Sequence, residues 1–202
     1  MLTTSLPQRN PFTEDAPLQV VGFDPSLRNW GVAKGLLHLN ASLEIQIQEV
    51  DVITPHLPTT KQVRQNSLDL ESARQLAEEA YRAALQAHAV FVEVPVGSQS
   101  ARAMASYGIC VGVLGALRAQ GIPFFEVSPL EVKLASVGKK TASKQEIIRW
   151  ALDQHPEANW PRYKDKGEHK VSEAKAEHMA DAVAAIYAGV HSVPFRQMLT
   201  LR

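Results

Sequence analysis

The sequence predicts an α/β domain with a mixed five-stranded sheet that is flanked by helices. The chain has 202 residues and 45% apolar side chains, which is enough for one ordinary domain with a buried core. Three strand-like segments joined by short turns come first, and this order predicts an antiparallel meander. A strand-helix-strand unit follows, which is typical of parallel strands added to a sheet. The predicted strands are residues 18–23, 31–38, 43–53, 89–94 and 122–127.

Helical periodicity predicts the elements that cover this sheet. Apolar residues recur at helical spacing over residues 61–88, and residues 101–120 form a second, mostly apolar helix. Ser143 and Glu146 have the spacing of a capping box, so a helix is expected to begin at Ser143. The remaining predicted segments are a short helix at 129–137, an irregular polar connection at 154–172 and a last helix at 173–190.

One domain is expected over residues 18–193, because no internal repeat or low-complexity tract marks a second one. Residues 1–17 contain three prolines and no apolar block, so we expect a loose N-terminal tail there. Residues 194–202 begin with a proline and are expected to form a C-terminal tail. The longest uncharged stretch, residues 103–117, is shorter than the roughly 20 apolar residues of a membrane span, so none is expected.

The charge balance excludes no class of partner, and the cysteine content favours a reducing compartment. The 21 basic residues balance the 21 acidic ones, so the net charge does not indicate a polyanionic partner. The single cysteine, Cys110, cannot form an internal disulfide. A cytoplasmic location is therefore expected.

Glu93 is the most informative acidic residue, because it lies in a run that otherwise predicts a fully buried strand. A buried carboxylate without a partner costs several kcal/mol, so Glu93 needs a cation or a proton. The alternative is that the strand ends at Glu93, whose side chain then faces solvent or an arginine such as Arg102.

Asp24, His178 and Asp181 are the other candidates for a site. Asp24 directly follows an apolar strand, although an Asp-Pro-Ser sequence is also typical of a simple turn. His178 and Asp181 are three residues apart in the last predicted helix, so they share one face and could share a metal ion. The alternative is a helix N-terminus at which Asp181 interacts with the helix dipole.

The order of these motifs resembles that of the RuvC-like Holliday-junction resolvases, a family of the RNase H-like superfamily. The resemblance covers residues 19–190 and rests on several short motifs in the family's order. They are VGFDPS at 21–26 with Gly31 after it, FVE at 91–93, the glycine-rich helix from Ala103, FFEV at 124–127 and ADA at 180–182.

This resemblance implies an RNase H-like fold and a metal-dependent endonuclease that cuts Holliday junctions or other branched DNA. The four implied metal ligands are Asp24, Glu93, His178 and Asp181. Asp24 would bridge two Mg²⁺ or Mn²⁺ ions, Glu93 and Asp181 would flank them, and His178 would be a ligand or a general base. Carboxylates with one imidazole suit these cations, and two such ions can support phosphodiester hydrolysis.

A DNA substrate requires a local basic surface, and the sequence contains one clear candidate. Five basic residues fall within 17 positions: Lys133, Lys139, Lys140, Lys144 and Arg149. Their place after the strand-helix-strand unit matches the family's DNA-binding segment, and the helix start at Ser143 could also bind a phosphate. The alternative is a solvated, charged loop.

Two other function classes are compatible with parts of the sequence. A catalytically silent DNA-binding protein on the same fold would not need all four ligands. A phosphotransferase of the sugar-kinase and actin type also begins with a strand-Asp turn, but no second phosphate loop is evident. The chain also departs from the resolvase pattern near Val96, where family members carry an aromatic residue that acts at the junction centre.

A homodimer is expected, because a four-way junction needs two symmetry-related cuts. Gly108, Gly112 and Gly115 give the predicted helix 101–120 a stripe of small residues that would let two copies approach closely. Cys110 lies in the same helix, so the dimer would also hide the only thiol.

Overall fold

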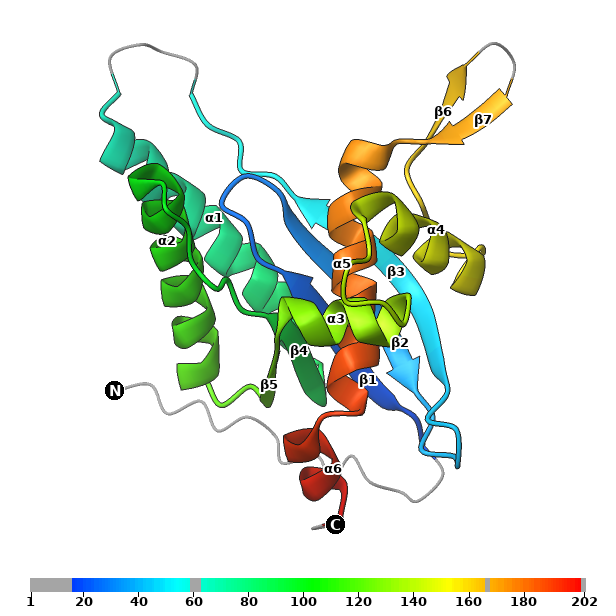
Figure 1. The fold of residues 1–202 in the computed structure, drawn as a ribbon. Coiled ribbons are helices and arrows are strands. Elements are labelled where there is room, and N and C mark those ends of the chain that lie inside the picture. Colours follow the sequence, from blue (N-terminus) through cyan, green and yellow to red (C-terminus); the bar gives the residue numbers. More distant parts are fainter. Residues whose placement is uncertain (1–15, 59–62, 166–167, 201–202) are drawn as a thin grey trace.

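The computed structural model describes residues 16–58, 63–165 and 168–200, and it contains one mixed five-stranded sheet in the order β3-β2-β1-β4-β5 (Figure 1). β1 pairs antiparallel with β2, and β2 with β3, whereas β4 runs parallel to both β1 and β5. The strands are β1 (Leu18–Asp24), β2 (Trp30–Leu37), β3 (Ile45–Ile53), β4 (Ala89–Glu93) and β5 (Phe124–Val127). The predicted fold class is confirmed.

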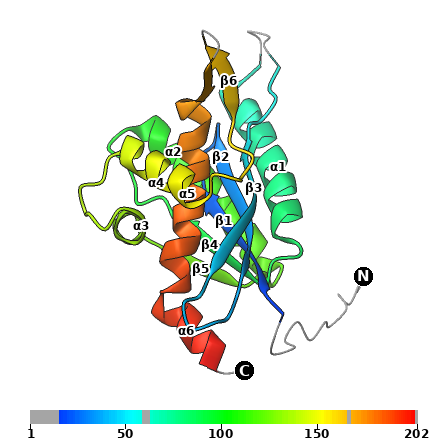
Figure 2. The ribbon, with the colours of Figure 1, turned by 90° about the vertical axis from the view of Figure 1, so that its right-hand side faces the viewer.

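Helices cover both faces of this sheet. The main helices are α1 (Gln65–Ala84), α2 (Ala101–Ala119), α3 (Pro129–Ser136), α4 (Lys144–Gln154) and α5 (Glu173–Val190). α5 packs directly on the sheet and carries α3 and α4 beside it, while α1 lies on the opposite face (Figure 2). In the part of the chain that the structure describes, no helix is long and apolar enough to cross a membrane.

The sheet separates two apolar cores, and β4 contributes to both. Val90 and Val92 point into the core under α1 and α2, whereas Phe91 points into the core under α5. All three side chains are fully buried. Side chains alternate between the two faces of a strand, so a central strand covered on both faces is an uninterrupted apolar run. This explains why residues 89–92 contain no polar residue.

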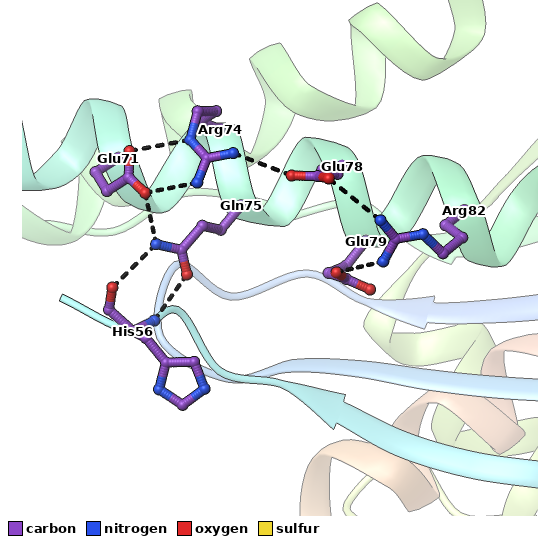
Figure 3. A network of polar contacts seen from close by, with 7 residues as sticks. All are labelled: His56, Glu71, Arg74, Gln75, Glu78, Glu79 and Arg82. Carbon is purple, nitrogen blue, oxygen red and sulfur yellow. Dashed lines mark hydrogen bonds and ion pairs between the residues drawn. The ribbon is translucent and has the colours of Figure 1, made fainter.

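A polar network on α1 anchors the segment that follows β3 (Figure 3). The Gln75 side chain accepts a hydrogen bond from the His56 main-chain N–H at 2.8 Å and donates one to the His56 carbonyl at 2.9 Å. Glu71 accepts hydrogen bonds from Gln75 and from Arg74. The contacts with His56 are therefore connected to the charged outer face of α1. The outer face is otherwise a ladder of exposed ion pairs. The network therefore fixes the path of the chain beyond the sheet edge.

The connection expected to be irregular over residues 154–172 is the main error of the sequence analysis. It contains a two-stranded hairpin, β6 (Arg162–Asp165) and β7 (Glu168–Val171), which stands away from the main sheet (Figure 1). Each strand has four residues, and the two pair only with each other. Their sequences, RYKD and EHKV, contain no alternation of apolar and polar residues, so no strand is predicted from them.

The C-terminal segment also differs from its expected form, because residues 193–200 form helix α6 rather than a tail. Pro194 occupies the first turn, where a missing N–H costs no helical hydrogen bond. Phe195 is fully buried, with its ring centroid 5.0 Å from that of Phe91 and 5.1 Å from that of Phe125. The N-terminal tail expected over residues 1–17 lies almost entirely outside the described residues.

Several element boundaries lie inside the predicted ones. β3 begins at Ile45 rather than 43, because Leu43 has a positive φ of 52° and belongs to the preceding turn. The helix expected over 61–88 is α1, which begins at Gln65 and ends at Ala84, while residues 61–62 lie outside the described residues. The capping box predicted at Ser143 and Glu146 is present.

Candidate active site

Asp24 and Glu93 lie at the carboxyl ends of two adjacent parallel strands. Phe23 in β1 is paired with Val92 in β4, and each acidic residue follows its partner of this pair directly. The carboxyl ends of parallel strands meet at one edge of a sheet, where side chains from several strands converge on a ligand. The two carboxylates therefore lie at the same edge of the sheet.

Close packing of α5 brings the other two candidates over this edge. Gly31 in β2 is paired with Asp24 in β1, and a Cβ atom at position 31 would lie 2.0 Å from the carbonyl oxygen of His178. A Cβ atom at Gly22 would lie 2.0 Å from the carbonyl oxygen of Ala182. Only glycine permits an approach this close. These two contacts set the height of α5 above the sheet and place His178 beside Asp24.

His178 and Asp24 are joined by a hydrogen bond of 2.7 Å between Nδ1 and Oδ2. Their side chains are only 19% and 20% exposed. The hydrogen bond to Asp24 raises the pKa of His178 and outweighs the opposing effect of burial. α5 begins at Glu173, so His178 and Asp181 lie beyond its first turn. The alternative, in which Asp181 lies in the first turn and interacts with the helix dipole, is therefore excluded.

The carboxyl groups at this edge oppose one another's ionisation. Burial, together with the charge of Asp24, raises the pKa of Glu93 to about 7. Burial, together with the charges of Asp24 and Glu93, raises the pKa of Asp181 to about 8. Repulsion of this kind arises between carboxyl groups that lie near one another. A bound cation would remove the repulsion.

The chemistry of the four donors fits a divalent cation, whereas their arrangement is not that of a closed coordination shell. Three carboxylates and one imidazole are the oxygen and nitrogen ligands that Mg²⁺ and Mn²⁺ accept. Within residues 16–58, 63–165 and 168–200, however, no three His, Cys, Asp or Glu side chains are grouped tightly enough to hold a metal ion. His178 is instead hydrogen-bonded to Asp24.

Two of the five predicted DNA-binding residues reach the acidic edge. Lys144, the first residue of α4, forms an ion pair with Glu177, and its pKa is raised chiefly by that contact and further by Asp181 and Asp24. The charge of Lys133 favours the ionised form of Glu93. Positive charge therefore stands directly beside the carboxylates.

The other three basic residues lie farther out on the α3 and α4 side. Lys139 is ion-paired with Glu146 at 3.3 Å, and Glu146 also caps α4. Lys140 and Arg149 are exposed.

Sequence reasoning missed Glu177 and the true partner of Arg102. Glu177 precedes Asp181 by four residues, a spacing that places both on one helix face, so a signal was present. Arg102, the alternative partner for Glu93, instead donates two hydrogen bonds of 2.6 and 2.7 Å to Asp69. That pair joins α1 to α2 across 33 residues of sequence, and no local pattern indicates it.

No protein-family profile and no curated protein sequence matches this chain. Solved structures do match it. RuvC of T. thermophilus in complex with a Holliday junction substrate is similar with a TM-score of 0.60 and 18% identity, over 84% of this chain and 93% of RuvC. A second T. thermophilus RuvC structure gives a TM-score of 0.58 at 18% identity, over 91% of this chain and 98% of RuvC.

A eukaryotic structure gives the same result. The yeast mitochondrial Holliday junction resolvase Ydc2 is similar with a TM-score of 0.57 and 16% identity, over 94% of this chain and 83% of Ydc2. At these identities the likeness concerns the arrangement of helices and strands. The chain therefore has the RuvC-like resolvase fold.

Proposed function

We propose that this protein is a metal-dependent, structure-selective endonuclease that cleaves phosphodiester bonds in Holliday junctions or other branched DNA. The observation that carries the proposal is the convergence of Asp24, Glu93, His178 and Asp181 at one edge of a RuvC-like sheet. Lys144 and Lys133 stand beside these acids, as a phosphodiester substrate requires.

Asp24, Glu93 and Asp181 would hold Mg²⁺ or Mn²⁺, in the two-ion arrangement that the sequence analysis expects. When bound, such ions activate a water molecule and stabilise the leaving oxygen. Partial burial of Asp181 and Glu93 strengthens their interaction with a cation. His178, oriented by Asp24, is placed to bind a cation or to take up a proton.

Lys133 and Lys144 would bind the phosphate that is cut. Lys144 is held near the acids by Glu177, so its position is set before DNA arrives. The positive charges of the two lysines would offset the repulsion between the phosphate and the carboxylates. Lys140 and Arg149 would extend the contact to the backbone of one DNA arm.

A homodimer belongs to the same proposal, and α2 supplies the surface. Gly108, Gly112 and Gly115 have open space where a Cβ atom would stand, so none of the residues that the structure describes covers them. Met104 and Val111, on the same helix, are 46% and 45% exposed. Small and apolar residues that face outward allow two helices to pack closely. Cys110 points the other way into the protomer's own core, so burial of the thiol does not depend on a dimer.

The proposal is tested by incubating the purified protein with Mg²⁺ or Mn²⁺ and end-labelled four-way, three-way and linear DNA of the same sequence. Metal-dependent, paired cuts in the branched substrates are expected, with linear duplex left intact. Omission of the metal should abolish the cuts. Equal cutting of linear DNA would contradict structure selectivity, and intact junctions that are nevertheless bound would favour the catalytically silent alternative.

A further inference from the structure

Two hollows lie on the α1 and α2 side of the molecule, away from the basic surface of α3 and α4. The larger, about 480 Å³, is formed by the turn after β1, the segment after β3 and the start of α1. The smaller, about 300 Å³, is formed by the same turn and the start of α2. Leu27, Arg28 and Arg102 line both hollows, so the two arginines stand on the ridge between them.

This ridge is close to the candidate active site along the chain. Arg28 follows Asp24 by four residues, and Arg102 follows Glu93 by nine. Both segments leave the sheet at the edge where these two carboxylates lie. A DNA strand that passes over the carboxylates would therefore meet the ridge within a short length of backbone.

The charge of the ridge is positive and partly fixed in place. Arg102 is held by two hydrogen bonds to Asp69, which also accepts one from Gln65 at 2.9 Å. Asp69 is only 9% exposed, and the contact with Arg102 lowers its pKa. Arg28 is exposed, lies near enough to Asp69 to lower that pKa further, and makes no hydrogen bond or ion pair within the described residues. Two guanidinium groups against one carboxylate leave a net charge of +1.

The residues that line the larger hollow suit a flat ring with polar edges. Leu57 and Leu68 supply apolar walls, while Asn29 and Thr54 supply an amide and a hydroxyl group. Pockets for small ligands combine apolar walls with a few polar groups in the same way. An unstacked base has two apolar faces and hydrogen-bonding edges, so its chemistry matches.

We propose that Arg28 and Arg102 bind a backbone phosphate of the strand to be cut and that the larger hollow receives the base unstacked from that nucleotide. The inference rests on the proposed function and names the part of the substrate that is recognised. Bases at a branch point are easily unpaired, so little free energy is needed to move one of them out of the stack. Val96 is 80% exposed and is not aromatic, so the hollow would hold an open branch point where an aromatic wedge is absent.

The test uses a four-way junction that carries 2-aminopurine next to the branch point, with no divalent metal so that no cutting occurs. The parent protein is expected to raise the fluorescence, because 2-aminopurine brightens when it is unstacked. Arg28→Ala should remove this rise and reduce the salt dependence of binding by about one counterion. Arg118→Ala is the matched control, since Arg118 is an exposed arginine at the far end of α2.

Arg102 needs a different variant, because its removal alone would leave Asp69 buried without a partner. The pair Asp69→Asn with Arg102→Gln keeps two hydrogen-bonding side chains and removes the charges. It should lower the fluorescence response as Arg28→Ala does, with thermal stability measured alongside. Unchanged fluorescence and salt dependence in both variants would overturn the site. A parent protein that binds no junction at all would instead overturn the proposed function, so the two failures are distinct.

Discussion

His178 stands directly over Gly31, with its carbonyl oxygen 2.0 Å from the place that a Cβ atom at position 31 would occupy. Gly31 is also the ladder partner of Asp24. Gly31, which sets the distance between α5 and the sheet, is thus the neighbour of Asp24, to which His178 is hydrogen-bonded. A change at Gly31 must move the imidazole relative to the carboxylates, although Gly31 has no side chain of its own.

Gly31→Ala is therefore expected to reduce both stability and cleavage. A backbone atom cannot move aside as a flexible side chain can, so we expect a loss of about 3 kcal/mol or more in the free energy of unfolding. Urea unfolding measures this loss. Gly108→Ala is the matched control, because nothing lies within 4 Å of its Cβ position, and it should gain about 0.5–1 kcal/mol. Equal effects at the two glycines would refute the close approach.

Asp24→Asn should abolish cleavage and leave junction binding unchanged or tighter. The change removes a ligand charge and some repulsion of DNA phosphates while it preserves shape. The loss should exceed the roughly 10- to 100-fold cost of removing a ligand's supporting partner. Glu93→Gln and Asp181→Asn should behave alike, and their double variants should lose no more than the single ones. Single-turnover cleavage rates measure this, and a residual rate close to the parent's would exclude Asp24 from the site.

Replacing Lys139 and Lys140 together with alanine should weaken junction binding and lower its salt dependence by one to two counterions. Lys139 already pairs with Glu146, so most of the effect should come from Lys140. Binding titrations at several salt concentrations measure the slope. Arg74→Ala with Arg82→Ala removes two cations from the outer face of α1 and should leave the slope unchanged. An unchanged salt dependence of binding in the lysine variant would show that this segment is a solvated loop that does not contact DNA.

Gly112→Leu should convert a dimer into monomers that cut junctions poorly. The new side chain would project from the uncovered face of α2 into the partner. Sedimentation should give about twice 22.2 kDa for the parent and 22.2 kDa for the variant. Gln86→Leu adds the same side chain to a different exposed position and should leave the mass unchanged. A parent that is monomeric while it cuts both strands in concert would contradict the dimer.

Stability should fall as the pH decreases below about 6.5, in part because of His155. Burial lowers the pKa of this histidine below its ordinary value of 6.5, and its Nε2 lies 2.9 Å from the Tyr187 hydroxyl group. The unfolded chain then binds the proton more readily, so the contribution is complete above pH 6.5 and is lost as the pH falls through the folded pKa. His155→Gln should flatten this pH dependence by up to about 1.4 kcal/mol per pH unit. Identical profiles for parent and variant would show that His155 does not titrate.

Much of the sheet and its acidic edge could be predicted because local patterns specify them. The apolar run before Glu93 and the one before Asp24 each predict a strand that ends in a carboxylate, and the register then places the two together. The spacing of His178 and Asp181 predicts a shared helix face. What no pattern predicts is the tertiary pairing of Asp69 with Arg102, or of Lys144 with Glu177, because each joins two helices.

The hairpin and α6 were missed for opposite reasons. The four-residue sequences of β6 and β7, RYKD and EHKV, contain no apolar alternation, whereas α6 has one fully buried large side chain, Phe195. One phenylalanine after a proline carries no periodicity. Its contribution becomes visible only when Phe91 and Phe125 are seen beside it.

The position of Phe195 has a consequence for how the chain can be shortened. Phe195 closes the core beneath Phe91, two residues before Glu93 in the same strand. A fragment that stops at residue 193 would retain every candidate ligand and yet leave a ring-sized void under the strand that presents Glu93. Loss of a buried phenylalanine costs about 3–5 kcal/mol, a large share of the stability of a single domain. The shortest fragment able to hold this site in shape must therefore extend through α6.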